Sequence, residues 1–499
     1  MFSRNEIASR RGSVSAGWRS RGRVSRQTLR FLISLALTLP TLALVAGVSA
    51  PDASAVAPGQ QLQINISSNA QGGTGTTTMG EPEIAQNPLN RDNLFIDWNT
   101  FRYPASNLTP VPNPCGGMTS MDRGVTWRPA TVPLSSCADG IAAFGPDGTL
   151  YAGGIVVTST TVVLPNPTCP PNSIRFGGVC LVVHGYDAIV RSTDSGQTWS
   201  APVKIMGSTV SPPGPFPFAP GSGNPSDTFD RPWLAIDQST GTIYATGHNI
   251  VDHESFVTAS TDGGQAFRTI YAADSPAYPS NGLPGGTLAA ANGVLAVAYT
   301  AASAPGATCP CVIFETSTDN GATFTRHVVP TVNAAGISRP FVAADPTGRG
   351  RFALTIFDAT GTRNQVYTTS DFGQSWQGPT DVGEAPPNQQ FKPWLSFSPS
   401  GQLALVWRTY HGTPGTAPYD VWAAVGRVLG AHGASFSAPV RVSSVAASYP
   451  PLNPGGGGDD FSFVLADNQY VHIGWGDSRN GRTETWYGRI SLPTFKASG

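Results

Sequence analysis

The octapeptide Ser192-Thr193-Asp194-Ser195-Gly196-Gln197-Thr198-Trp199 is the main indicator of the fold, because variants of it recur along the chain. Each copy has Ser or Thr, an Asp two residues later, a Gly two residues after that, and then a small residue followed by an aromatic one. The five copies occupy residues 120–127, 192–199, 260–267, 317–324 and 369–376, and a degenerate sixth is Gly433-Ala434-Ser435-Phe436. A motif that returns at intervals of 52 to 72 residues predicts a repeat architecture.

The residues of this motif have the chemistry of a tight hairpin. An Asp side chain can accept hydrogen bonds from backbone N–H groups of its own turn. The Gly supplies the positive φ that lets the chain reverse. The aromatic residue begins the returning strand, where its ring can pack between neighbouring sheets. We therefore expect the five aspartates to stabilise turns, and we assign them no catalytic role.

Each copy of the motif follows two further strand-like segments. Before Asp262, for example, residues 231–237 and 242–247 are separated by a Gly turn, and comparable pairs begin near Glu83, Gly140, Gly286, Arg339, Lys392 and Phe461. Seven units of four strands predict an all-β propeller of four-stranded blades, with six blades as the alternative. The last unit stops after its third strand. The alternating segment 61–66 is therefore expected to supply the missing outer strand and close the ring.

The composition agrees with short strands joined by turns. Charged residues make up 12% of the 499 residues, about half of the usual ~25%. Gly and Pro are abundant, at 57 and 44 residues, and this balance favours strands and turns over helices. The net charge of −1 gives no support for a nucleic-acid partner, which normally requires a basic patch. We expect no nucleic-acid binding.

The N-terminus has the features of an export signal. Eight arginines precede an apolar run from Phe31 to about Val48, and Ala53-Ser54-Ala55 fits a small-residue cleavage site. An uncleaved membrane anchor is the alternative, but the run contains Pro40 and is short for a span of ~20 residues. We predict a secreted or cell-surface monomer that meets a membrane only through this segment. Its expected parts are a leader at 1–55, an N-terminal segment at 56–80, a propeller at 81–490 and a tail at 491–499.

Cysteine usage agrees with export. The six cysteines form three local pairs, Cys115/Cys137, Cys169/Cys180 and Cys309/Cys311, which we expect to be disulfides in an oxidising compartment. None of these spacings suits zinc. We predict no metal site and no other cofactor.

The motif resembles the Asp box, or BNR repeat, of the sialidase superfamily, and the resemblance covers roughly residues 60–490. The motif joins the third and fourth strands of a blade, so it lies at one end of each blade. The connections between blades, and those between second and third strands, emerge at the other end around a central funnel. Binding sites are expected where loops converge on a rigid scaffold. In sialidases the active site occupies this face.

Cations occur in the segments that this topology assigns to the funnel. Arg231, Arg339 and Lys392 each precede a proline at the start of a unit, whereas Arg408 and Arg479 follow second strands. Several cations around one mouth suit a carboxylate or another anion, especially through bidentate Arg contacts. We therefore expect these five residues to bind the substrate, an anionic glycan or other anionic ligand. The alternative is structural: the repeated cations pair with carboxylates on the next blade.

The resemblance to sialidases also implies a catalytic set. That family uses a Tyr nucleophile activated by a Glu, with an Asp as acid and base. By this resemblance Tyr410 is the nucleophile, Glu254 its base and Asp230 the acid. The sequence departs from the family in lacking its Arg-Ile-Pro signature, in having only seven Glu, and in having seven predicted blades where the catalytic fold has six. Two hypotheses stay open: a sialidase-type glycoside hydrolase, and a non-catalytic propeller that binds glycan or protein.

Overall fold

The computed structural model describes most of the chain from residue 61 onward. The described ranges are 61–67, 77–102, 115–163, 174–176, 179–206, 229–249, 255–272, 287–330, 340–357, 363–383, 389–413, 416–450 and 459–496. The predicted leader and cleavage site lie outside these residues. The chain divides into two units, Met1–Ser49 and Ala50–Gly499, and every element below belongs to the second.

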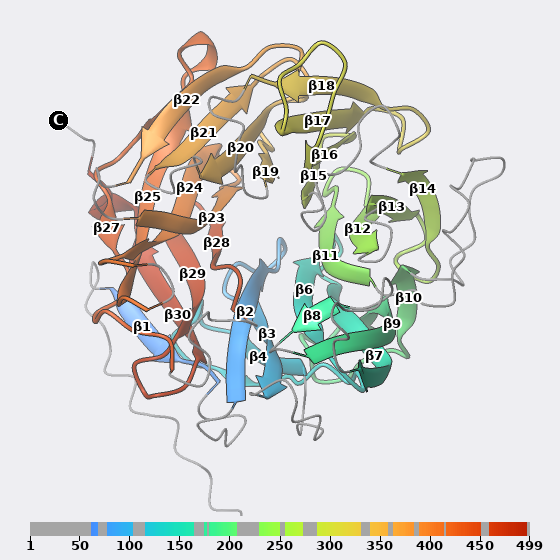
Figure 1. Ribbon diagram of the computed structural model, residues 1–499, viewed down its shortest axis with the longest axis vertical. Coiled ribbons are helices and arrows are strands. Elements are labelled where there is room, and N and C mark those ends of the chain that lie inside the picture. Colours follow the sequence, from blue (N-terminus) through green and yellow to red (C-terminus); the bar gives the residue numbers. More distant parts are fainter. Residues whose placement is uncertain are drawn as a thin grey trace, which may run out of the picture. The chain divides into compact units, whose positions relative to one another are not determined.

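Seven antiparallel sheets form a β-propeller (Figure 1), which confirms the predicted fold class and blade number. The first three blades follow the chain order. Blade 1 contains β2 (Thr77–Gln86), β3 (Leu94–Arg102), β4 (Cys115–Ser120) and β5 (Arg128–Pro129). Blade 2 contains β6 (Ala138–Phe144), β7 (Leu150–Val163), β8 (Ile174–Phe176), β9 (Val179–Ser192) and β10 (Val203–Met206). Blade 3 contains β11 (Phe229–Ile236), β12 (Ile243–Asn249), β13 (Ser255–Ser260) and β14 (Arg268–Ala272).

The remaining blades repeat this plan. Blade 4 contains β15 (Thr287–Ala291), β16 (Val294–Ala301), β17 (Cys311–Ser317) and β18 (Thr325–Val329). Blade 5 contains β19 (Phe341–Ala344), β20 (Phe352–Phe357), β21 (Asn364–Thr369) and β22 (Gln377–Val382). Blade 6 contains β23 (Gln389–Phe397), β24 (Gln402–Tyr410), β25 (Tyr419–Val428), β26 (Ala434–Phe436) and β27 (Val440–Arg441). Blade 7 contains β28 (Phe463–Ala466), β29 (Tyr470–Asp477), β30 (Glu484–Ser491) and the N-terminal β1 (Leu62–Asn65).

Strand β1 closes the ring by pairing antiparallel with β30, with Leu62 opposite Arg489 and Asn65 opposite Trp486. It occupies the outer position that the last repeat lacks, where the sequence predicts a closing strand. An N-terminal strand in this place covers the edge that β30 would otherwise expose. Helix is confined, in the described residues, to the short 3-10 turns η1 (Gly430–His432) and η2 (Leu492–Thr494). None of the described helices has the length and apolarity needed to cross a membrane.

The five motif copies form the turns between the third and fourth strands of blades 1–5, and we call them the Asp turns. In the first, Asp122 Oδ1 accepts hydrogen bonds from the N–H groups of Val125 (3.1 Å) and Thr126 (2.8 Å). The N–H of Gly124, which has φ 82°, donates to Ser120 Oγ at 2.8 Å. In each of the other four turns the N–H four residues after the Asp donates to its carboxylate, and at Asp194 and Asp262 the N–H three residues after it does so as well. The predicted turn-stabilising role of these aspartates is confirmed.

The inner strands β2, β6, β11, β15, β19, β23 and β28 surround the axis, and each contacts the next (Figure 1). Aromatic side chains from four blades meet there: Trp233, Phe341, Trp394, Phe461 and Phe463. The ring of Trp394 lies 4.8 Å from that of Trp233 and 4.5 Å from that of Phe341. We call these five residues the aromatic plug, because their rings, buried except for the partly buried Trp394, hold the inner strands together.

The cysteine predictions have three different outcomes. Cys309 and Cys311 form the expected disulfide. The prediction for Cys115 and Cys137 is wrong, because both are buried free thiols in the structure. Each thiol is satisfied by a backbone carbonyl, Cys115 by that of Ser136 at 3.5 Å and Cys137 by that of Gly153 at 3.7 Å. The third pair lies outside the described side chains.

Candidate functional site

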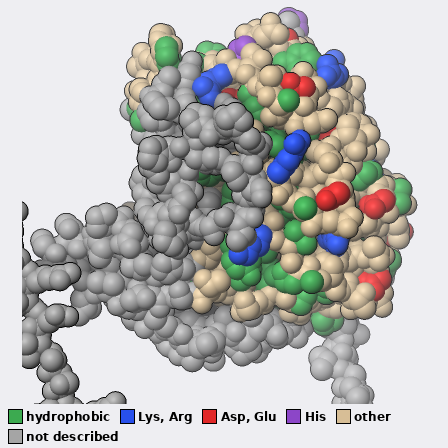
Figure 2. Space-filling model, turned by 90° about the vertical axis from the view of Figure 1, so that its right-hand side faces the viewer, with side chains coloured by type: hydrophobic (Ala, Val, Ile, Leu, Met, Phe, Trp, Pro, Cys, Tyr) green, Lys and Arg blue, Asp and Glu red, His purple; other side chains and the backbone are tan. Residues whose placement is uncertain are grey.

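A group of charged side chains from several blades meets at one end of the propeller axis, and other charges are spread over its side (Figure 2). Figure 2 shows the side: on the part of this face that the structure describes, Lys, Arg, Asp and Glu lie singly among uncharged side chains. The inner strands begin at the end of each blade opposite to the Asp turns, as the pairing of β11, β12 and β13 shows. The gathered charges lie near these first residues.

Four inner strands have the same irregularity close to their start. The pairing of β2, β6, β11 and β23 with the following strand shifts by a bulge. In each bulge one charged residue has a left-handed backbone: Glu81 (φ 54°), Asp139 (46°), Arg231 (58°) and Lys392 (53°). This conformation costs a residue other than glycine roughly 1–2 kcal/mol. Bulges and strained residues of this kind are typical of functional sites, where they re-aim a side chain.

These residues belong to one group of charges, which we call the axial cluster: Glu81, Asp139, Arg231, Lys392, Arg408, Asp459 and Asp460. Arg231 connects its first half. The Arg231 N–H donates to Asp139 Oδ2 at 3.0 Å, and the guanidinium lies 3.8 Å from the same oxygen. The guanidinium also lies 3.9 Å from Glu81 Oε1 and donates a hydrogen bond to Asp460. Side chains from blades 1, 2, 3 and the start of blade 7 thereby meet around one arginine.

Arg408 connects the second half. This side chain of β24 is fully buried and donates to both carboxylate oxygens of Asp459, at 2.5 and 2.9 Å. The Tyr449 hydroxyl accepts hydrogen bonds from Arg408 at 2.9 Å and from Lys392 Nζ at 2.8 Å. Lys392 also donates to the backbone carbonyl of Asp459. These contacts fix the backbone just before β28, and so they position the neighbouring Asp460.

Burial changes the pKa of two members of the cluster. It raises the pKa of Glu81 well above its ordinary value, an effect that Asp139 and Asp460 increase and Arg231 opposes. Burial lowers the pKa of Lys392 to about 8, although Asp459 counteracts it.

Access to the cluster differs strongly among its members. The Arg231 side chain is 7% exposed and that of Glu81 2%, whereas Asp460 is 38% exposed. Asp460 also donates its backbone N–H to Glu81 Oε1 at 2.9 Å. Of the described members of the cluster, Asp460 is therefore the one that a ligand reaches first, and the cation behind it is Arg231.

The structure brings three of the five predicted substrate-binding residues together. Arg231, Lys392 and Arg408 all belong to the axial cluster. Arg231 pairs with Asp460, whereas Lys392 and Arg408 pair with Asp459, and both aspartates lie in the segment just before β28. Arg479 lies apart from them: it pairs with Asp477 at 2.7 Å and packs on the Trp486 ring at 3.9 Å. Arg339 lies outside the described residues.

The predicted catalytic set stays a prediction. Tyr410 is 5% exposed, and its ring stacks on that of Phe391 with a centroid separation of 3.7 Å. Asp230 lies at the start of β11, opposite His248, but its side chain is outside the described part. Glu254 also lies outside the described residues. The ring of Tyr410 is thus packed against the rings of Phe391 and Tyr419.

Glu81, Asp139 and Tyr449 were not predicted as site residues from the sequence. Glu81-Pro82 follows the same charge-and-proline pattern as Arg231-Pro232 and Lys392-Pro393, so an alignment of all seven units by this dipeptide would have found it. In Asp139-Gly140 a glycine replaces the proline and weakens the signal. Tyr449 lies in a segment with no counterpart in the other units, and we find no signal for it in the sequence. In the described part of the chain, no group of three or more His, Cys, Asp or Glu side chains is placed to hold a metal ion.

No protein-family model and no curated protein matches this chain. Solved structures with a similar fold include a Dyadobacter fermentans protein of unknown function, with 13% identity, a TM-score of 0.47, and coverage of 87% of this chain and 99% of that one. A Hadza microbial sialidase has 15% identity and a TM-score of 0.42, over 80% of this chain and 74% of that one. An α-L-arabinofuranosidase from Fusarium graminearum has 15% identity and a TM-score of 0.38, over 74% and 96%. Structural similarity at this level does not assign a role to any individual residue of the site.

Proposed function

We propose that this protein is an exported β-propeller that binds acidic glycans at the axial cluster. The observation that carries the proposal is the ion pair between Arg231 and Asp460. The arginine is fixed by contacts with three other segments, while its carboxylate partner is exposed. The carboxylate of an acidic sugar can take the place of Asp460 on the guanidinium, because it makes an equivalent charge-assisted hydrogen bond.

The surroundings of Arg231 favour this exchange. Its position is set by the bulge in β11 and by Asp139, so little conformational freedom remains to be lost on binding. Burial raises the pKa of Glu81, and this reduces its repulsion of an incoming carboxylate. Trp233 and Phe461, which are neighbours of Arg231 and Asp460 in the chain, belong to the rigid aromatic plug.

Export is part of the proposal, because the Arg-rich N-terminus and its apolar run resemble a signal peptide. The Cys309–Cys311 disulfide supports an oxidising compartment. The resemblance of the Asp turns to sialidase repeats supports an acidic sugar as the ligand.

Calorimetric titration with N-acetylneuraminic acid, glucuronic acid and neutral galactose tests the binding proposal. We expect the two acidic sugars to bind. Arg231→Met is expected to weaken them by about tenfold or more through loss of the charge-assisted bond. Asp460→Asn is expected to tighten binding, because it removes the carboxylate that competes for Arg231.

The matched control is Arg441→Met, which removes an arginine paired with Asp420 in blade 6, outside the axial cluster. It should leave the affinity unchanged. Equal affinities in the wild type and Arg231→Met, or weaker binding in Asp460→Asn, would contradict the proposal.

A specific observation favours a second candidate function, hydrolysis of a glycosidic bond. This reaction needs one carboxyl group that is protonated at neutral pH and a second that is ionised. Glu81 accepts a hydrogen bond from the Asp460 N–H at 2.9 Å and has a raised pKa, which favours the role of the protonated group, and Asp460 is the candidate for the second. A panel of fluorogenic glycosides tests it: turnover should fall about 100-fold or more in Glu81→Gln, with the fold retained by circular dichroism. Absence of turnover by the wild type over the panel rejects hydrolysis and leaves binding.

A further inference from the structure

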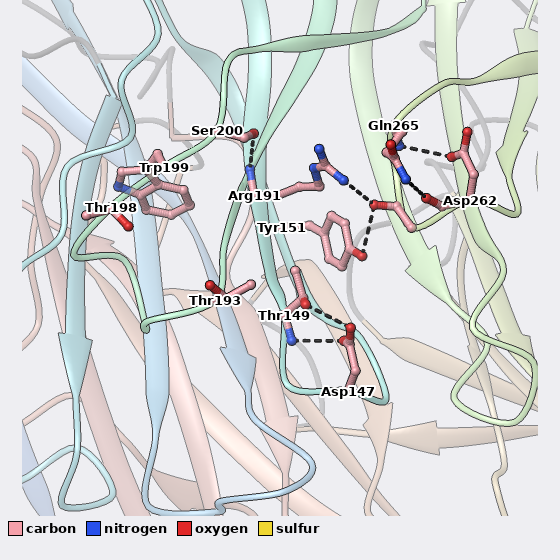
Figure 3. A pocket seen from close by; sticks show the side chains of 11 residues that line it. Asp147, Thr149, Tyr151, Arg191, Thr193, Thr198, Trp199, Ser200, Asp262 and Gln265 are labelled. Atoms are coloured by element: carbon pink, nitrogen blue, oxygen red, sulfur yellow. Dashed lines mark hydrogen bonds between the residues drawn. The ribbon is translucent and has the colours of Figure 1, made fainter.

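A second candidate site lies at the opposite end of the ring, between blades 2 and 3. A cleft of about 530 Å³ opens there beside the Asp turns of both blades (Figure 3). We call it the inter-blade cleft and define it by Asp147, Tyr151, Arg191, Trp199, Asp262 and Gln265. In Figure 3, Trp199 lies on one side and Asp262 and Gln265 on the other, with Arg191 and Tyr151 between them.

The base of the cleft is held rigidly across the two blades. The Tyr151 hydroxyl of β7 donates to the Gly263 carbonyl at 3.3 Å, and Arg191 Nη1 of β9 donates to the same oxygen at 2.9 Å. Gly263 belongs to the Asp turn of blade 3 and has φ 70°. Trp199 is fixed in the cleft wall by an edge contact with Phe95, at a centroid separation of 5.9 Å. The cleft is therefore largely formed before any ligand enters it.

Arg191 differs from the arginines of the axial cluster. Arg231 and Arg408 each pair with a carboxylate, whereas among the described residues no carboxylate lies within ion-pair distance of Arg191. Its Nε is buried and meets no hydrogen-bond acceptor in the described part of the chain. Arg191 lines the cleft without a carboxylate partner among the described residues, so a ligand oxygen in the cleft can accept a hydrogen bond from its guanidinium.

The two carboxylates that line the cleft are held by their own turns. Asp147 accepts hydrogen bonds from the N–H and the hydroxyl of Thr149, at 3.0 and 2.9 Å. Asp262 accepts from the N–H groups of Gln265 and Ala266, at 2.9 and 3.1 Å. These carboxylates repel an anionic ligand, and Arg191 repels a cationic one. The ligand that fits is uncharged and has groups that both donate and accept hydrogen bonds.

From this lining we infer that the inter-blade cleft is a carbohydrate site for neutral sugars of one or two units, separate from the axial cluster. Sugar hydroxyls donate to the Asp147 and Asp262 carboxylates and accept from Arg191 and Gln265. The indole of Trp199 offers an apolar surface to the C–H face of a sugar ring. The volume lies within the range of about 300–1,000 Å³ that is usual for small-ligand pockets.

The test is calorimetric titration of the full-length protein with lactose, cellobiose and maltose. We expect at least one of them to bind. Arg191→Met should weaken that binding by about tenfold, and Gln265→Ala by a smaller factor, because each removes one hydrogen-bond donor.

Gln197→Ala provides a matched control. Gln197 Nε2 donates to the Asp194 carbonyl at 2.9 Å, as Gln265 Nε2 does to that of Asp262, but Gln197 does not line the cleft. This variant should bind as the wild type does. The inference is overturned if none of the three disaccharides binds with a dissociation constant below about 10 mM. It is also overturned if Gln197→Ala weakens binding as much as Gln265→Ala. Loss of binding in Arg231→Met would place the sugar at the axial cluster and would also overturn it.

Discussion

Acidic side chains at the two ends of the ring are used in opposite ways. In the Asp turns the carboxylates are exposed, and their partners lie within four residues of them in the chain. The Thr198 hydroxyl and N–H hold the pKa of Asp194 at about 2. In the axial cluster the carboxylates meet cations from other blades, and burial raises the pKa of Glu81. The interactions of the Asp turns are local hydrogen bonds in contact with solvent, whereas those of the axial cluster are desolvated ion pairs between residues far apart in the chain.

This difference indicates which charges contribute most to the free energy of unfolding. A solvated carboxylate that loses its partners can be hydrated instead, so the loss is small. A buried charge without its partner has no such alternative. Four substitutions probe this contrast, and the expected change in stability decreases from the first to the fourth.

The largest effect is expected for Arg408→Ala in the axial cluster. Removal of this fully buried arginine leaves Asp459 buried without its main partner, and such losses cost about 3–5 kcal/mol of unfolding free energy. Urea denaturation followed by tryptophan fluorescence measures the cost. A loss below about 1 kcal/mol would show that the pair is dispensable.

A pH-dependent effect is expected at Asp97, a buried carboxyl of β3. Burial raises its pKa to about 8, against roughly 3.9 when unfolded. The folded state therefore holds more protons between these values, and the unfolding free energy falls as the pH rises through this window, by up to about 1.4 kcal/mol per pH unit. Asp97→Asn should remove this contribution. The check is urea unfolding of both proteins at several pH values from 5 to 9, and parallel pH profiles would contradict the assignment.

A moderate effect is expected for Asp122→Ala in the first Asp turn. The change removes the acceptor of several local hydrogen bonds, which corresponds to about 1–2 kcal/mol. Asp92→Ala is the comparison variant, because Asp92 is 55% exposed and makes only a surface pair with Arg123, at 3.0 Å. Thermal unfolding of the two variants should separate them, and equal melting temperatures would argue against the role of the turn.

The smallest effect is expected for Arg363→Ala on blade 5. Arg363 and Asp381 form an ion pair whose side chains are 49% and 40% exposed. Surface pairs of this kind contribute about 0–1 kcal/mol, and salt weakens them further. Denaturation at low and high salt measures the contribution. A loss close to that of Arg408→Ala would remove the distinction between solvated and buried pairs.

The fold was predictable because its signals are local and repeated. Five Asp turns mark five blades, the degenerate copy marks a sixth, and two strand-like segments with a third strand mark the seventh. The pairing of β1 with β30 follows from an incomplete last unit and an alternating segment at the other end of the chain. The free thiols Cys115 and Cys137 were not predicted, because closeness in sequence does not fix the geometry of a disulfide.

The site was predictable only in part. The charge-and-proline dipeptides of Arg231 and Lys392 reveal positions at the start of inner strands, and the structure places both in the axial cluster. Their partners Glu81, Asp139 and Tyr449 come from distant segments, and only the closed ring brings them together. Burial raises the pKa of Glu81 and of Tyr449, and burial at a meeting point of several blades is not encoded in any single repeat.

The most direct test of the axial cluster as a ligand site is a crystal of the protein soaked with N-acetylneuraminic acid. We expect the sugar carboxylate to form a hydrogen bond with Arg231 and the Asp460 side chain to move away from the guanidinium. A structure in which Asp460 keeps its bond to Arg231, and the sugar is absent from the axial cluster, would contradict it.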